Sequence, residues 1–196
     1  MDKIIEIECG KELTNQVRKR VLIYLSQFPE VFCRPPGPWV PSKLPPHEID
    51  TGDSEPIKVP YRRIPHHLRK YVEHEIAVML RMGVIRPPTS PWSAPILMVA
   101  KPDGTYRMCV DARKSPNSVT KVQRGQLPLI RDILESLAGK KYLSVLDLSK
   151  GYYNALLTPE SCERSAFTCH MWHFEHTRVF FGLAPHPSGS PTRWQK

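Results

Sequence analysis

The sequence has no apolar run long enough to span a lipid bilayer, which excludes a helical membrane anchor within these residues. Its first residues show neither the cationic start nor the apolar centre of a secretory signal. We therefore expect an intracellular protein, in the cytoplasm or nucleus, that is not secreted and has no membrane partner.

Cysteine is scarce, with 5 residues in 196. An odd number of widely scattered cysteines does not resemble a disulfide framework. We expect reduced thiols at all five positions, which are Cys9, Cys33, Cys109, Cys162 and Cys169.

Acidic side chains are few in the middle of the chain. The whole sequence has 28 basic and 19 acidic residues, a net charge of +9, and residues 61–150 hold 16 of the basic and 7 of the acidic ones. A localised excess of this kind suits a surface that follows phosphates, because each neutralised phosphate releases condensed counterions. A solvated basic face without a partner is the alternative that charge alone leaves open.

Proline, in contrast, is abundant, with 21 residues or about twice the usual frequency of about 5%. Proline interrupts helices and central strands, so long uninterrupted elements should be few. An amphipathic helix is predicted over residues 14–27, and the proline-rich stretch 34–46 is predicted to be an extended linker.

The rest of the chain alternates helical and strand patterns, which predicts an α+β fold. Helices are predicted at 65–83 and 127–137, a strand pair at 94–100 and 105–111, a strand at 142–148, and a further hairpin from 165–170 and 174–181. Asp103 and Gly104 form a hairpin signal between the first two strands.

One carboxylate interrupts the apolar strand predicted at 142–148. An aspartate in such a strand is costly to bury unless it is paired, hydrogen-bonded or bound to a cation. Asp147 is that residue, and a basic hairpin at 101–107 precedes it in the sequence. Capping of the following turn is the simpler structural reading of Asp147.

A series of short segments extends this pattern along the chain. In order they are 47–52 (HEIDTG), 56–62 (PIKVPYR), 79–85 (MLRMGVI), 89–96 (TSPWSAPI), 101–107 (KPDGTYR), 109–111 (CVD) with Arg113, 127–128 (LP), 146–148 (LDL) with 151–152 (GY), 166–167 (AF) and 181–183 (FGL). Each is weak alone, but their joint order and spacing are specific. The series closely resembles the reverse transcriptases of gypsy-like LTR retrotransposons and retrovirus-related Pol polyproteins.

The resemblance implies a polymerase right hand made of fingers and an incomplete palm. It covers residues from about 27 to 183. We expect an N-terminal helix and Pro-rich linker at 1–43, the fingers and partial palm at 44–183, and an irregular, divergent tail at 184–196.

The resemblance also implies a metal site. Asp147 would be its first metal-binding carboxylate, with Mg²⁺ as the cofactor of two-metal nucleotidyl transfer. The backbone carbonyl of Leu148 would assist as a neutral oxygen ligand.

Five further residues receive roles from the same resemblance. Lys101 and Arg107 would contact the triphosphate of the incoming dNTP. Tyr152 would lie beneath the sugar and exclude a 2′-hydroxyl. Asp111 and Arg113 would position the fingers and the template strand, so that the partners are a dNTP and an RNA or DNA template-primer.

The metal site predicted by resemblance is incomplete in these 196 residues. The family places two more aspartates in a Tyr-x-Asp-Asp hairpin, and no aspartate follows Leu183. We expect a chain truncated within the palm that binds template-primer but is inactive alone. A noncatalytic nucleic-acid-binding module derived from a retrotransposon is the alternative, and the oligomeric state is open.

A zinc module is a third hypothesis, built from Cys169, His170, His173 and His176. The segment is predicted to be a hairpin, in which successive side chains alternate between faces. We therefore expect structural or exposed histidines here instead of a zinc site.

Overall fold

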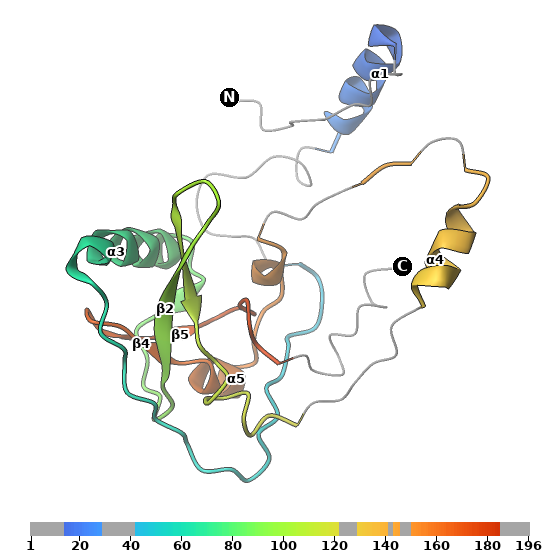
Figure 1. Ribbon diagram of the computed structural model, residues 1–196. Coiled ribbons are helices and arrows are strands. Elements are labelled where there is room, and N and C mark those ends of the chain that lie inside the picture. Colours follow the sequence, from blue (N-terminus) through green and yellow to red (C-terminus); the bar gives the residue numbers. More distant parts are fainter. Residues whose placement is uncertain (1–13, 29–41, 122–128, 141–142, 146–149, 185–196) are drawn as a thin grey trace. The chain divides into compact units, whose positions relative to one another are not determined.

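Residues 14–28, 42–121, 129–140, 143–145 and 150–184 are described by the computed structural model of the chain (Figure 1). The contacts divide the chain into two compact units, Met1–Pro38 and Trp39–Lys196. Within the described ranges, no helix combines the length and the apolar character that a membrane crossing requires.

Helix α1 (Asn15–Leu25) belongs to the first unit and confirms the helix predicted at 14–27. Its N-terminus is capped by Thr14, whose hydroxyl oxygen accepts a hydrogen bond from the amide of Val17 at 3.4 Å. None of its residues is buried.

Helix α3 (His66–Arg81) is the longest helix of the second unit and confirms the helix predicted at 65–83. The helix is followed by its C-cap Met82 and then by Gly83, which adopts a φ of +65° that glycine tolerates at low cost. The amide of Val84 then donates to the carbonyl of Met79 at 3.1 Å. The buried stripe recurs at helical spacing, at Leu68, Val72, Ile76 and Met79.

Five strands form one mixed sheet in the order β1-β5-β4-β2-β3. Their bounds are β1 Ile85–Arg86, β2 Ala94–Ala100, β3 Tyr106–Val110, β4 Phe167–Thr168 and β5 His173–His176. Strand β2 runs parallel to β4, and the other three pairs are antiparallel. The β2–β3 and β4–β5 hairpins are both confirmed, although β4 and β5 are shorter than predicted.

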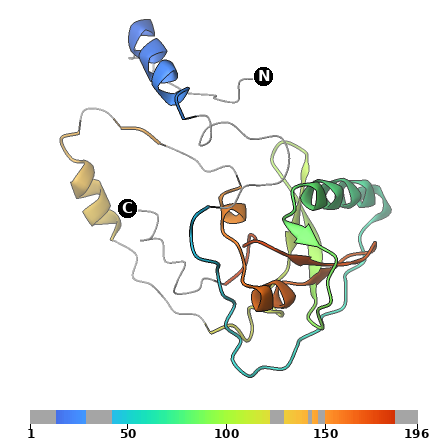
Figure 2. The same ribbon diagram turned by 180° about the vertical axis from the view of Figure 1, so that it is seen from behind.

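The main core lies between the sheet and the buried stripe of α3 (Figures 1 and 2). Val72 and Ile76 from the helix belong to the same buried cluster as Ile96 and Phe167 from the sheet, and all four are almost completely buried. Burying each such side chain is worth about 1.5–3 kcal/mol, so this cluster holds α3 against the sheet.

Helix α4 (Ile130–Leu137) falls within the helix predicted at 127–137, whose residues 127 and 128 lie outside the described residues. The strand predicted at 142–148 is wrong where it can be compared, because residues 143–145 belong to no strand and Val145 is 94% exposed. An apolar run becomes a strand only where a neighbouring strand offers backbone partners, and none pairs with these three residues within the described sheet.

Two short helices follow. The 3₁₀ turn η1 (Gly151–Asn154) starts after Lys150, which has a left-handed backbone with φ of 50°. Helix α5 (Pro159–Arg164) is capped by Thr158, whose hydroxyl accepts from the amide of Ser161 at 3.3 Å. These elements bring Tyr152 and the segment around Phe181 into one region of the second unit.

Candidate nucleotide and nucleic-acid interface

The turn of the β2–β3 hairpin has a fixed geometry. Asp103 accepts hydrogen bonds at Oδ1 from the amide of Thr105 at 2.9 Å and from its hydroxyl at 2.6 Å. These bonds lower the pKa of Asp103. Gly104 takes a φ of +78°, and the amide of Lys101 donates to the carbonyl of Thr105 at 2.8 Å. The two strands are therefore held in register up to the turn.

This register places the two predicted cations on one face of the hairpin. Val99 is opposite Arg107, and Ala100 is opposite Tyr106. Because alternate residues of a strand share a face, Lys101 and Arg107 project to the same side as Val99. We call this side, with Val99, Lys101, Thr105 and Arg107, the outer face.

The opposite side is the inner face, formed by Met98, Tyr106 and Met108. All three contact the core under α3. The ring of Tyr106 lies 5.5 Å from that of Tyr71 on the helix. The outer face is consequently directed away from α3, which leaves it open to a ligand.

Asp111 lies just beyond β3 and is a buried carboxylate with two arginine partners. Arg113 donates to it from Nε at 2.7 Å and from Nη2 at 2.9 Å, and Arg62 donates at 2.6 Å. The hydrogen bonds from Arg113 hold the pKa of Asp111 below its usual value, against the opposing effect of burial. The structure thus brings together the predicted pair Asp111 and Arg113.

Both guanidinium groups of this cluster remain accessible, with side chains 50% exposed for Arg62 and 76% exposed for Arg113. Asp111 fixes where these two cations lie, and each keeps donors free of the carboxylate. The sequence did not single out Arg62 as a partner of Asp111, although it ends the segment 56–62.

Tyr152 is exposed and has an aromatic neighbour that the sequence did not indicate. Its ring meets that of Phe181 edge to face, with centroids 5.8 Å apart and an interplanar angle of 78°. Both side chains are more than half exposed, so the pair forms an apolar platform at the surface.

The platform is anchored on both sides. Asn117 donates from its side-chain amide to the carbonyl of Gly182 at 2.7 Å, and its side-chain oxygen accepts from the amide of Ala184 at 2.9 Å. Asn117 therefore holds the turn that carries Phe181.

On the other side, Tyr153 is partly buried and donates its hydroxyl to the sulfur of Met79 on α3 at 3.4 Å. Burial raises the pKa of Tyr153 to about 12, so this hydroxyl stays protonated. The two successive tyrosines therefore differ in environment: Tyr153 attaches η1 to the core, and Tyr152 is exposed to solvent.

The predicted metal ligands Asp147 and Leu148 lie outside the described residues. Within the described ranges, no three His, Cys, Asp or Glu side chains come together in a way that could hold a metal ion. The described residues therefore supply no complete metal centre.

The histidines of the zinc hypothesis have separate partners. The Nε2 of His173 lies 3.3 Å from the carbonyl of Ser90, so this nitrogen is the donor. Its Nδ1 therefore accepts from the hydroxyl of Thr168 at 2.7 Å. His176 is fully buried, donates from Nδ1 to the carbonyl of Ser165 at 3.1 Å and stacks on Phe180. Burial lowers the pKa of His176 to about 4, which keeps it neutral. His173 and His176 thus make hydrogen bonds and ring contacts within the fold.

Sequence comparison finds relatives among retrovirus-related Pol polyproteins. The polyprotein from transposon opus of Drosophila melanogaster is 32% identical over 169 residues, which cover 84% of this chain and 17% of that protein. The polyprotein from transposon gypsy of the same organism is 32% identical over 142 residues, which cover 69% of this chain and 14% of that protein. The chain thus spans less than a fifth of these relatives. No protein-family profile matches the sequence.

Comparison with solved structures also finds reverse transcriptases. The foamy viral protease-reverse transcriptase in complex with an RNA/DNA hybrid superposes with a TM-score of 0.76 at 28% identity, covering 90% of this chain and 24% of that one. The native enzyme of prototype foamy virus superposes with a TM-score of 0.74 at 27% identity, covering 88% and 23%. These neighbours confirm the α+β fold class expected from the sequence.

Proposed function

The chain is a relative of the reverse transcriptases in retrovirus-related Pol polyproteins, and we propose that its second unit binds a template-primer and an incoming dNTP. The observation that carries this proposal is the outer face of the β2–β3 hairpin, where Arg107 is opposite Val99 and Lys101 follows Val99 by two positions. The structural neighbour that binds an RNA/DNA hybrid supports it.

The outer face would bind the triphosphate. Lys101 offers three donors on a flexible stem, and Arg107 offers a planar fork that matches two phosphate oxygens. Their charges would hold the triphosphate by charge-assisted hydrogen bonds, which are about twice as strong as neutral ones. The tight turn at Asp103 and Thr105 keeps both cations at one end of the hairpin.

The platform of Tyr152 and Phe181 would receive the sugar and base. An aromatic edge beneath a deoxyribose leaves no room for a 2′-hydroxyl, so Tyr152 would select deoxynucleotides by steric contact. Phe181 supports the ring of Tyr152 from the side, at 5.8 Å between centroids. Arg62 and Arg113, held by Asp111, would contact the phosphates of the template strand.

Nucleotidyl transfer would require a two-metal site, of which the 196 residues supply only a part. Asp147 is proposed as the carboxylate for Mg²⁺, assisted by the carbonyl of Leu148, and the bound ion would stabilise charge on the transferred phosphate. The sequence has no aspartate after Asp147. We therefore propose that the 196-residue chain binds template-primer without extending it.

The test combines binding and primer extension with the purified chain. Fluorescence anisotropy with a labelled RNA–DNA template-primer should show binding that weakens as salt rises, and Asp147→Asn should leave that binding unchanged. Extension with dNTPs and Mg²⁺ should give no product.

Each result separates one part of the proposal. Mg²⁺-dependent extension that Asp147→Asn abolishes would show that the chain is an active polymerase by itself. Binding without extension, unaffected by the same substitution, is the result expected of the 196 residues, and it would also fit a noncatalytic nucleic-acid-binding module. Absence of salt-sensitive binding would overturn both functions.

A further inference from the structure

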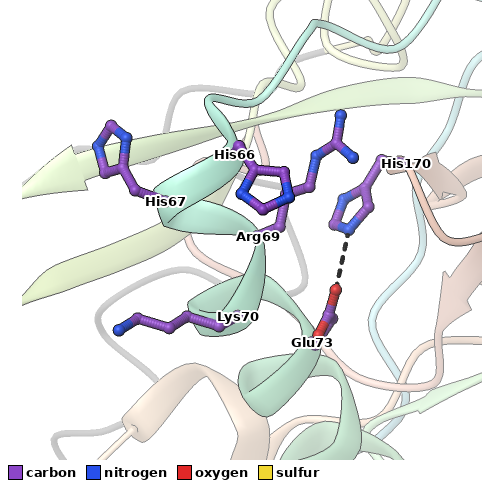
Figure 3. Close-up of a pocket in the computed structure, with 6 residues that line it drawn as sticks. All are labelled: His66, His67, Arg69, Lys70, Glu73 and His170. Carbon is purple, nitrogen blue, oxygen red and sulfur yellow. Dashed lines mark hydrogen bonds and ion pairs between the residues drawn. The ribbon is translucent and has the colours of Figure 1, made fainter.

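A basic pocket lies at the N-terminal end of α3, on the side of the sheet that the helix covers (Figure 3). Its volume is about 380 Å³, within the range of pockets that hold small molecules. The lining residues are His66, His67, Arg69, Lys70, Glu73 and His170. Five of the six can carry positive charge, and none of them belongs to the outer face of the hairpin.

The backbone at this end of α3 adds to the positive potential. The first turn of the helix has no acidic residue, and no side chain caps its first amides. Free amides at a helix N-terminus attract anions through the helix dipole. In Figure 3, the side chains of His66 and Arg69 extend from α3 toward the same region as His170.

The two ring nitrogens of His170 have different surroundings. The residue comes from the β4–β5 connection, and its Nε2 faces Glu73 at 3.4 Å, a long contact. Its Nδ1 is buried and meets no hydrogen-bond partner among the described residues. Because Nδ1 has no accessible surface, the nitrogen of His170 that a ligand in the cavity could reach is Nε2.

Glu73 is the single acid in the pocket lining, and it occupies the accessible nitrogen of His170. Its side chain is 53% exposed, whereas that of His170 is 15% exposed. The pocket thus has a positive lining with one carboxylate, which binds the histidine nitrogen that a ligand oxyanion would use. Glu73 and a bound oxyanion would therefore compete for the same donor.

We propose that this pocket is a second phosphate-binding site, independent of the outer face. Arg69 would provide the main charge-assisted hydrogen bonds, and His66 and His170 would bind from the two elements that border the cavity. The phosphate group could come from a free nucleotide or inorganic phosphate, or from the backbone of a nucleic-acid strand that passes over α3. The chemistry is the same in both cases, and the test distinguishes them.

The experiment is an NMR titration of the ¹⁵N-labelled chain with inorganic phosphate at constant ionic strength, repeated with a short single-stranded oligonucleotide. Resonances of Arg69 and His170 should shift and saturate. Arg69→Gln should weaken phosphate binding about tenfold or more. Glu73→Gln should strengthen it severalfold, because it removes the competing carboxylate.

Arg81→Gln is the matched control, because Arg81 is exposed at the opposite end of the same helix. It removes the same charge from the chain and should leave phosphate binding unchanged. A saturable response to phosphate alone identifies a free phosphate or nucleotide site, and tighter binding of the oligonucleotide identifies a strand backbone.

Two results would overturn the proposal. One is a shift that grows linearly with phosphate and is equal at Arg69 and Arg81. The other is weaker binding by Glu73→Gln, which would make that carboxylate a structural support of the pocket. Neither depends on template-primer binding, so the pocket and the proposed function can fail separately.

Discussion

On the inner face of the β2–β3 hairpin, Met98, Tyr106 and Met108 contact the core beneath α3, whereas on the outer face Arg107 is exposed and Lys101 partly so. The two sets of residues alternate along the same strands. One hairpin thus has two kinds of side chain: the inner residues fix where the strands lie, and the outer ones, which we propose bind the ligand, are free to carry charge. Substitutions should therefore affect folding on one face and ligand affinity on the other.

The largest loss of stability is expected where α3 meets the inner side of the sheet. Ile76→Ala leaves a cavity beneath a residue that is 1% exposed, so the free energy of unfolding should fall by about 3 kcal/mol. Val99→Ala on the outer face should cost about 0.5 kcal/mol or less. Urea unfolding followed by circular dichroism measures both, and equal losses would break the comparison.

Acid should weaken the buried side of the sheet through His176. The pKa of His176 is about 4 in the folded chain, below the 6.5 of an ordinary histidine. Between these values the unfolded chain binds the proton more readily. The free energy of unfolding should therefore fall as pH drops from about 6.5 to 4, by up to roughly 3 kcal/mol.

His176→Phe provides the control for this effect, since it keeps an aromatic ring beside Phe180 and cannot bind a proton. Urea titrations at several pH values should show a shallower pH dependence for the variant than for the wild type. Parallel curves would mean that His176 is accessible to protons in the folded chain.

Asp111 should contribute less, because both of its arginine partners are exposed to solvent. We expect Asp111→Asn to cost about 1–2 kcal/mol at neutral pH. The pKa of Asp111 is lowered in the folded chain, so this difference is present above pH 4 and should shrink as the pH falls through the folded pKa. Urea unfolding of the wild type and the variant from pH 7 downward gives the comparison, and a stability difference that does not shrink at all below pH 4 would argue against the ion pairs.

The smallest change in stability is expected at the aromatic platform. Asn117→Ala removes two hydrogen bonds to the Phe181 turn and should cost about 1 kcal/mol. Hydrogen exchange at Gly182 and Ala184 should become faster. Ser118→Ala, which removes one local bond from the neighbouring residue, should leave that exchange unchanged. Unchanged exchange in Asn117→Ala would show that other contacts hold the platform.

Local patterns predicted a large part of the fold. The apolar stripe of α3 is followed by Gly83, and Asp103-Gly104 marks a hairpin, so neither needed information from distant residues. Asp111 and Arg113 lie close together because they are only two positions apart in the sequence. The face shared by Lys101 and Arg107 follows once the hairpin register is known.

Contacts between distant segments could not be predicted in this way. Arg62 reaches Asp111 across 49 positions, and Asn117 reaches Gly182 across 65. These contacts depend on the order of strands in the sheet and on the path of the loops, which periodicity does not encode. The strand predicted at 142–148 shows the opposite error at its described residues, because apolar composition alone does not supply a pairing partner.

The most direct test of the outer face compares the affinity for a fluorescently labelled dNTP, with template-primer present, for the wild type, the double variant Lys101→Gln with Arg107→Gln, and the control Arg81→Gln. The double variant should bind the dNTP about tenfold or more weakly, because it lacks both cations that would hold the triphosphate. Arg81→Gln, on α3, should behave as the wild type. If the double variant loses no more dNTP affinity than Arg81→Gln, the outer face is not the triphosphate surface.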